Sequence, residues 1–194
     1  DIDRNKDVFL NLIYTDKVGN EIAKEQLVLN KKVKEPEYIE KKKAQFTRKK
    51  DKLIVDFESG NAVFSLETGA LISYEIGGKQ MLSDKDGFTH NLYRAFLDND
   101  RNIVRSWEPL EKLVYNGRLS SYEMKESEGR VKIVSKGTLS FGGKEIFECE
   151  IKYTVFPSGI MSVKPKVSYK SRFQKRFEVP RYGLSINLDS SLQN

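Results

Sequence analysis

The stretch Asn91-Leu92-Tyr93-Arg94-Ala95-Phe96-Leu97-Asp98-Asn99-Asp100-Arg101-Asn102 runs from apolar and aromatic residues into three consecutive Asx residues. Tyr, Phe and Leu favour a half-buried strand, and Asx side chains form turns by accepting hydrogen bonds from their own backbone. We therefore predict a strand over residues 91–97 that leads into a hydrogen-bonded corner at residues 98–100.

Arg94 lies inside this stretch and needs a carboxylate partner if it is even partly buried, because an unpaired guanidinium out of water is costly. Asp98 and Asp100 are the nearest carboxylates in the sequence. We predict a structural corner made of Arg94, Asp98, Asn99 and Asp100, in which Arg94 pairs with Asp98 or Asp100. The alternative is that these carboxylates face a ligand or a metal, although Asp-x-Asp without a nearby His or Cys is a weak metal signal.

The chain has the size and composition of an ordinary globular protein. It contains 194 residues, of which 38% are hydrophobic and 32% charged, enough for one domain or for one domain plus part of another. No apolar run approaches the ~20 residues of a membrane span, so we expect no membrane partner. The sequence opens at Asp1, close to a predicted strand and without an initiator Met, which indicates a piece of a longer protein. The compartment stays open between cytoplasm and periplasm.

The positive charge is concentrated in one segment. Residues 31–52 hold ten Lys or Arg and four Asp or Glu, a net charge of +6 that equals the net charge of the whole chain. A basic tract with Tyr38 and Phe46 could bind nucleic acid or another anionic surface. Because Glu and Lys alternate around Pro36, a solvated linker is the better interpretation, and we expect no nucleic-acid partner.

Short strands separated by turn residues follow one another along most of the chain. One strand shows the pattern well, because apolar residues from Phe147 to Val155 occupy alternate positions with Glu148, Glu150 and Lys152 between them. Strands are predicted at residues 7–14, 21–29, 53–57, 62–66, 71–76, 79–82, 119–127, 130–141, 144–156, 160–169 and 182–188, with a short helix from about Trp107 to Tyr115. Most connections are too short for crossover helices, so the sequence predicts an all-β antiparallel sandwich.

Few residues suggest catalysis. Cys149 lies on the apolar face of its strand, as expected of an inert buried thiol, and one cysteine forms no internal disulfide. His90 is the only histidine, which excludes a His-rich metal site, and we interpret it as a strand-edge residue.

Asp98, Asp100 and Glu108 could supply the paired acids of a glycosidase, but no spacing in the sequence fixes the ~5 to 10 Å between carboxylates that glycoside chemistry requires. Residues 84–87 predict an Asp-Gly turn rather than a calcium loop. We therefore assign no catalytic, substrate-binding or metal-binding residue.

The opening stretch also carries a family resemblance. Tyr93 to Asn102 resembles the R-A-P-x-D-N-D-x-G signature of the large β-galactosidases of glycoside hydrolase family 2, which opens their small-chain domain. Further segments resemble the family in the same order: Gly19 to Gln26 (G-x-E-x-A-x-x-Q), Phe64 to Leu71 (F-S-x-x-x-G-x-L), Trp107 to Gly117 (a short helical segment) and Val179 to Leu184 (L-P-R-x-G-L). Phe96 stands where the family has Pro, and Asn102 stands where it has Gly.

The resemblance implies a domain organisation and a parent activity. Residues 1–33 would end an immunoglobulin-like domain, residues 34–52 would be a basic linker, and residues 53–194 would be the N-terminal half of a small-chain sandwich similar to the galactose-mutarotase-like fold. The parent would hydrolyse terminal non-reducing β-D-galactosides, with its catalytic carboxylates and Mg²⁺ ligands in a separate barrel domain. This chain would then be non-catalytic, would hold no cofactor of its own, and would pack against the barrel and support the rim of the active site.

A second class of function is a free-standing carbohydrate-binding sandwich module. Such modules usually present an aromatic platform, and a single tryptophan, Trp107, gives this alternative little support. The unpaired strand edges of half a sandwich would favour self-association, so a homo-oligomer remains open.

Overall fold

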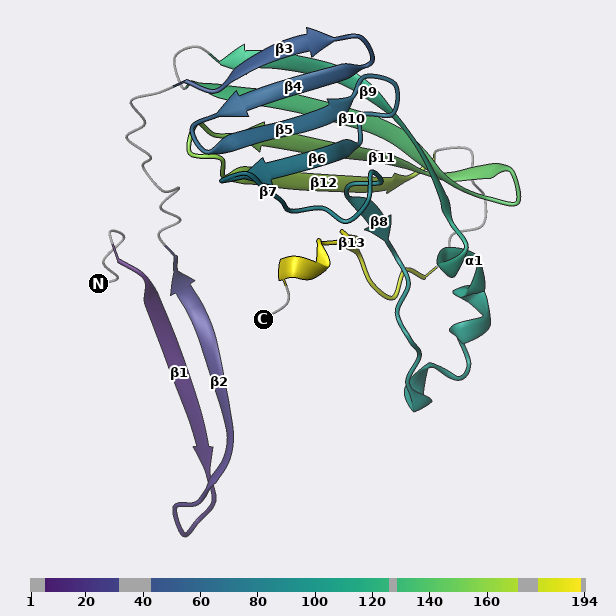
Figure 1. Ribbon diagram of the computed structural model, residues 1–194. Helices are drawn as coiled ribbons and strands as arrows, with labels where there is room; N and C mark the ends of the chain where they lie inside the picture. The colour runs from purple at the N-terminus through teal and green to yellow at the C-terminus, as the bar shows by residue number, and fades with distance from the viewer. Residues whose placement is uncertain (1–5, 32–42, 126–128, 171–177, 193–194) are drawn as a thin grey trace. The chain divides into compact units, whose positions relative to one another are not determined.

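The computed structural model describes residues 6–31, 43–125, 129–170 and 178–192 and divides into two units, residues 1–39 and 40–194. The first unit contains a hairpin of β1 (Val8–Thr15) and β2 (Glu21–Asn30), seen in Figure 1. Its turn is organised by Asp16, whose Oδ1 accepts hydrogen bonds from the backbone N–H groups of Val18 and Asn20 at 2.9 and 2.8 Å. The sequence thus builds this hairpin by ordinary Asx-turn chemistry.

The hairpin carries large apolar side chains on both of its faces. Phe9 pairs with Val28 on one face and Leu10 pairs with Leu27 on the other, and all four side chains are exposed. Two strands alone are marginally stable in water, so such a pair normally belongs to a larger sheet. The assignment of residues 1–33 to the end of an immunoglobulin-like domain agrees with this composition and stays a prediction.

The second unit is built on two antiparallel sheets that lie face to face in Figure 1. One sheet contains five strands in the order β3-β4-β5-β6-β7: β3 (Gln45–Lys49), β4 (Lys52–Phe57), β5 (Gly60–Ser65), β6 (Leu71–Ile76) and β7 (Lys79–Gln80). The other contains four in the order β12-β11-β10-β9: β9 (Val114–Lys125), β10 (Arg130–Phe141), β11 (Lys144–Val155) and β12 (Met161–Tyr169). The all-β antiparallel sandwich expected from the sequence is confirmed.

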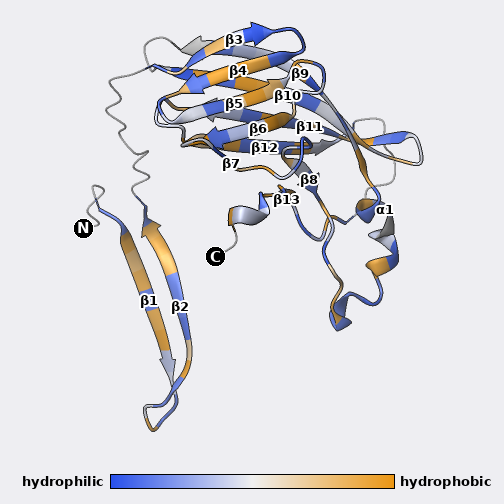
Figure 2. Ribbon diagram, in the orientation of Figure 1, coloured by the Kyte–Doolittle hydropathy of each residue, from blue (hydrophilic) through white to orange (hydrophobic). Residues whose placement is uncertain are grey.

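The main hydrophobic core lies between these two sheets. Along β4, and along β11 from Phe147 to Val155, every second residue is apolar and buried, and hydrophobic and hydrophilic colours alternate along the strands in Figure 2. Leu53 and Phe64 from the first sheet and Ile133, Ile151 and Tyr153 from the second are at most 1% exposed. The rings of Phe64 and Tyr153 meet edge to face with their centroids 5.0 Å apart, so the two sheets are joined by a favourable aromatic contact.

A second, smaller core lies where the chain leaves the sandwich between β8 and β9. Here β8 (Thr89–Asn91) pairs with β13 (Gly183–Ser185), and the following residues form the 3₁₀ turns Asp98–Asp100 and Val104–Ser106 and the short helix α1 (Glu108–Glu111). A third 3₁₀ turn, Ser190–Leu192, ends the described chain. The buried members of this second core are Leu92, Trp107, Leu110, Leu139, Ile146, Phe147 and Cys149. Among the described residues, no helix is long and apolar enough to cross a membrane.

Three elements differ from the sequence-based expectation. The strand predicted over residues 91–97 ends at Asn91, because Asn91 Oδ1 accepts the Tyr93 N–H and turns the backbone away from the β8–β13 ladder. The helix expected to reach Tyr115 ends at Glu111, because β9 begins at Val114 and pairs with β10. The linker predicted over residues 34–52 also ends early, because β3 occupies residues 45–49 and adds to the edge of β4. Residues 34–42 lie outside the described residues.

Gly137 in β10 sits at a point where the sheet admits no side chain. It pairs with Gly117 across the ladder, and the ring of Tyr115 lies over both. A Cβ on Gly137 would lie 2.3 Å from the Asn116 carbonyl oxygen and 2.8 Å from the Tyr115 ring. Real Cβ atoms do not approach backbone oxygen so closely, so backbone or ring must move to admit one.

We predict that Gly137→Ala destabilises the chain by about 1–3 kcal/mol, the usual cost of overpacking a well-packed site. Gly183→Ala is the matched control, because its Cβ would meet nothing closer than Arg181 at 3.8 Å. Urea unfolding monitored by circular dichroism measures both. Equal stability of the two variants would show that the sheet relaxes freely around Tyr115.

Candidate functional site

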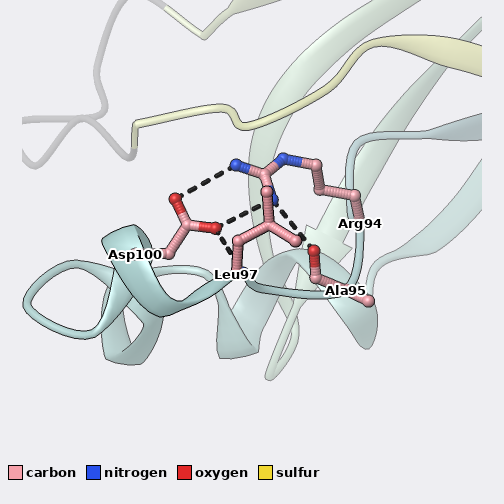
Figure 3. Close-up of polar contacts among 4 residues, drawn as sticks. All are labelled: Arg94, Ala95, Leu97 and Asp100. Carbon is pink, nitrogen blue, oxygen red and sulfur yellow. Dashed lines mark hydrogen bonds and ion pairs between the residues drawn. The ribbon is translucent and has the colours of Figure 1, made fainter.

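The corner predicted from the sequence is built around the guanidinium of Arg94. Its Nη1 donates to Asp100 Oδ2 at 2.8 Å and its Nη2 donates to Asp100 Oδ1 at 3.1 Å, which is a bidentate pair (Figure 3). Nη1 also donates to the Ala95 carbonyl oxygen at 2.9 Å. Asp100 Oδ2 accepts a further hydrogen bond, 2.7 Å long, from the Leu97 N–H. One carboxylate thus fixes both the arginine and the first turn of the loop.

Asp98 takes no part in this pair. Its carboxylate lies 2.8 Å from Arg101 Nη2, and its side chain is 89% exposed, against 11% for that of Asp100. Asn99 lies between the two aspartates in the same 3₁₀ turn and is exposed. Of the two partners left open by the sequence, the structure places Asp100 against Arg94.

The surroundings of Asp100 keep it ionised. The hydrogen bonds from Arg94, and then that from the Leu97 N–H, hold the pKa of Asp100 below its ordinary value of 3.8. A carboxylate with a lowered pKa and filled hydrogen-bonding positions is a poor general acid at neutral pH. The pair therefore has the chemistry of a structural element.

Trp107 covers the other side of the guanidinium, a contact that spacing along the sequence did not indicate. The guanidinium carbon of Arg94 lies 4.9 Å from the centroid of the indole ring, and Trp107 is 2% exposed. Arginine over an aromatic face is an attractive arrangement that strengthens as water is excluded. The ring connects the charged corner to the second core, and its Nε1 has no hydrogen-bond partner among the described residues.

His90 forms a separate aromatic cluster on β8. Its ring stacks on Tyr182 at a centroid distance of 6.1 Å and meets Tyr115 edge to face at 5.3 Å. The Tyr182 hydroxyl lies 3.4 Å from His90 Nδ1, while the buried Nε2 has no partner among the described residues. Burial lowers the pKa of His90 from 6.5 to about 4, so the ring is neutral at pH 7. No acidic partner reaches this histidine in the described part of the chain, which argues against a role as an activated base.

The remaining candidate groups are also passive. Cys149 is buried, and desolvation raises the pKa of its thiol to about 12, so it is not a nucleophile at neutral pH. Asp84 Oδ1 accepts the Asp86 N–H, which makes residues 84–87 an Asx turn. Glu108 begins α1, and its side chain is not among those described. In the part of the chain that the structure describes, no three His, Cys, Asp or Glu side chains gather in a way that could hold a metal ion.

We predict that Asp100→Ala lowers the melting temperature by about 4–10 °C, because it leaves the guanidinium of Arg94 without its partner under Trp107. Asp98→Ala, in the same turn and also paired with an arginine, is the matched control and should change it by less than about 2 °C. Adding Arg94→Met to Asp100→Ala should recover part of the loss, because coupled partners are non-additive. Equal effects of the two aspartates, or strictly additive losses, would contradict the pairing.

A second prediction concerns acid stability. The folded-state pKa of His90 is about 4, and the unfolded value is 6.5, so the unfolded chain takes up this proton first and stability is lost as pH falls from about 6.5 towards 4. His90 is the only histidine, and carboxylates with a lowered pKa lose their contribution only as the pH falls through their ordinary values of 3.8 to 4.5, below the pH 5 used for the comparison. The urea midpoint of the native chain should therefore be lower at pH 5 than at pH 7, whereas that of His90→Asn should change little. A midpoint that falls equally in both would assign the effect to other groups.

Comparison with known proteins places the chain within a described family. Residues 58–194 match the family model of the β-galactosidase small chain. A curated relative, a β-galactosidase of Halalkalibacterium halodurans, is 24% identical over 140 residues, which cover 70% of this chain and 13% of the relative. The chain thus spans only a small part of the length of the relative that it matches.

Proposed function

The chain belongs to the β-galactosidase small-chain family, and we propose that it acts as a non-catalytic domain of a larger glycoside hydrolase that cleaves terminal non-reducing β-D-galactosides. The proposal that the domain is non-catalytic rests on the partners of the two aspartates, Asp98 and Asp100. Both aspartates of the loop bind arginines, and Asp100 accepts three hydrogen bonds. Retaining and inverting glycosidases need a carboxylic acid that can donate a proton and a carboxylate that faces the substrate. Asp100 meets neither requirement, because its pKa is lowered and its oxygens are taken by Arg94 and the Leu97 N–H, and Asp98 is in an ion pair with Arg101 on an exposed turn.

The proposed role is to scaffold the remainder of the enzyme. A sandwich with two packed cores is a rigid body, and the pair of Arg94 and Asp100 holds the loop of residues 95–100 in one conformation. Phe96 and Leu97 are neighbours on this loop and are 57% and 65% exposed, so together they form a small apolar surface. We propose that this rigid surface packs against the barrel domain and supports the rim of its active site.

Mg²⁺, which the family resemblance implies for the parent, does not fit the described residues of this chain. The aspartates closest together in sequence at the corner bind Arg94 and Arg101, and cationic neighbours oppose a metal ion. We propose that the metal ligands lie in other parts of the parent. The hairpin of β1 and β2, apolar on both faces, would complete an immunoglobulin-like domain there.

We predict that the purified 194-residue chain does not hydrolyse a chromogenic β-galactoside, whereas the full-length parent does. Removal of residues 40–194 from the parent should abolish hydrolysis, because the barrel would lose the surface that supports its active site. Turnover of the substrate is the measurement. Activity that co-purifies with the isolated chain would refute the non-catalytic role, and an equally active truncated parent would refute the scaffolding role.

A further inference from the structure

The outer face of the four-stranded sheet carries an uneven distribution of charge. Side chains that point away from the core line up in rows across the strands, and two neighbouring rows are Ser121, Val134, Lys152 and Lys164, and Arg118, Lys136, Glu150 and Lys166. These rows contain five basic residues and one acidic residue. We call the exposed set Arg118, Lys136, Lys152, Lys164 and Lys166 the cationic ridge.

The positive charges of the cationic ridge are poorly compensated within the chain. Two lysines share the carboxylate of Glu150. Lys152 Nζ lies 3.1 Å from Glu150 Oε1, and Lys136 Nζ lies 3.8 Å from Glu150 Oε2. Among the described residues, Arg118, Lys164 and Lys166 make no ion pair. Basic side chains without ion-pair partners do not stabilise the sheet.

Two pairs of like charge face each other directly on adjacent strands. Arg118 is opposite Lys136, and Lys152 is opposite Lys164. Like charges directly opposite in a sheet are destabilising, because neighbouring strands are only about 4.8 Å apart. A bound anion would relieve this repulsion.

Hollows flank the cationic ridge on both sides. On one side, two hollows of about 520 and 190 Å³ share Lys136 and Glu148 and so adjoin each other. On the other side, a hollow of about 360 Å³ is lined by Lys152 and Lys164. Seven basic side chains and four glutamates line the three hollows, so positive charge is in excess; the glutamates are Glu123, Glu145, Glu148 and Glu150. The lining also contains hydroxyl and amide groups that can hydrogen-bond to sugar hydroxyls: Asn116, Ser121, Thr138, Thr154 and Ser168.

We propose that the cationic ridge binds an acidic oligosaccharide of the uronate type, which lies across the strands with its carboxylates on the basic side chains. The choice of a glycan over an acidic peptide rests on the proposed function in a glycoside hydrolase. The aromatic side chain that lines these hollows, Tyr153, is 1% exposed and points into the core, so in the described sheet face neither a pyranose nor a nucleobase finds an aromatic platform. Charge and hydrogen bonding therefore provide the affinity.

The test titrates the 194-residue chain with tetragalacturonate by isothermal calorimetry at 20 and 200 mM salt. Binding should weaken by about tenfold at the higher salt, because exposed charges are screened. Lys152→Gln/Lys164→Gln should weaken binding at least about fivefold at low salt. Lys49→Gln/Lys52→Gln is the matched control, since this exposed pair also faces across two strands but lies on the other sheet, and it should bind within about twofold of the native chain.

Thermal melts check the fold of each variant. Removal of the opposed lysines relieves repulsion, and Glu150 keeps Lys136 as a partner when its ion pair with Lys152 is lost, so Lys152→Gln/Lys164→Gln should melt no lower than the native chain. A lower melting temperature would show that these lysines stabilise the fold, and would contradict the proposal that their role is to bind a ligand.

Three other outcomes would overturn the proposal. They are no binding of tetragalacturonate at millimolar concentration, equal loss in the control variant, and equal or tighter binding of neutral β-1,4-galactotetraose or of a thymidine octanucleotide. The titration uses this chain alone and no hydrolase assay. Its failure leaves the proposed role in a β-galactosidase untouched, and an inactive parent leaves a measured affinity for uronates intact.

Discussion

The segment between β8 and β9 depends on the neutralisation of one guanidinium at the margin of an apolar core. Arg94 is 31% exposed, lies against the buried ring of Trp107 and could not stay there without an anion. Asp100 supplies that anion from six residues further on, and to do so the chain must turn tightly at residues 98–100. Beyond this turn, Trp107 and Leu110 pack with Leu139 and Phe147 of the four-stranded sheet, so the second core forms next to a paired charge.

Sequence patterns predicted the sandwich because a period of two along each strand directly reflects one buried face. They also predicted an aspartate for Arg94, but not which one, because both are within reach of a flexible side chain. The hydrogen bond from the Leu97 N–H to Asp100 selects this aspartate, and it forms only because residues 98–100 adopt a 3₁₀ turn.

The interpretation of Gln45–Lys49 as linker was wrong for another reason. This strand lies at the edge of its sheet and buries little, so its charged composition resembles that of a solvated segment. The His90–Tyr182 contact joins residues 92 positions apart, and no local pattern reports such a pair.

The outer face of the four-stranded sheet is more positive than the charge balance of the sequence suggests. Outside residues 31–52 the formal charges balance, which suggests an electrically neutral remainder. The alternation of a strand, however, places every second residue on one face, so a balanced sequence can build an unbalanced surface. Lys152, Lys164 and Lys166 gather on one face in this way. A linear charge sum therefore underestimates the local field of a β protein.

The pairing of β8 with β13 sets an order in which the chain can acquire its structure. Residues 89–91 find their partners only at 183–185, and closing so long a loop is entropically costly and late. The corner of Arg94 and Asp100 spans six residues and can close as soon as it leaves the ribosome, as can each hairpin of the two sheets. During synthesis, β8 therefore keeps an open edge, and His90 lacks its contact with Tyr182, while about ninety further residues are added. The short length of β8, three residues, makes that interval safe, because so brief an edge offers little for another chain to join.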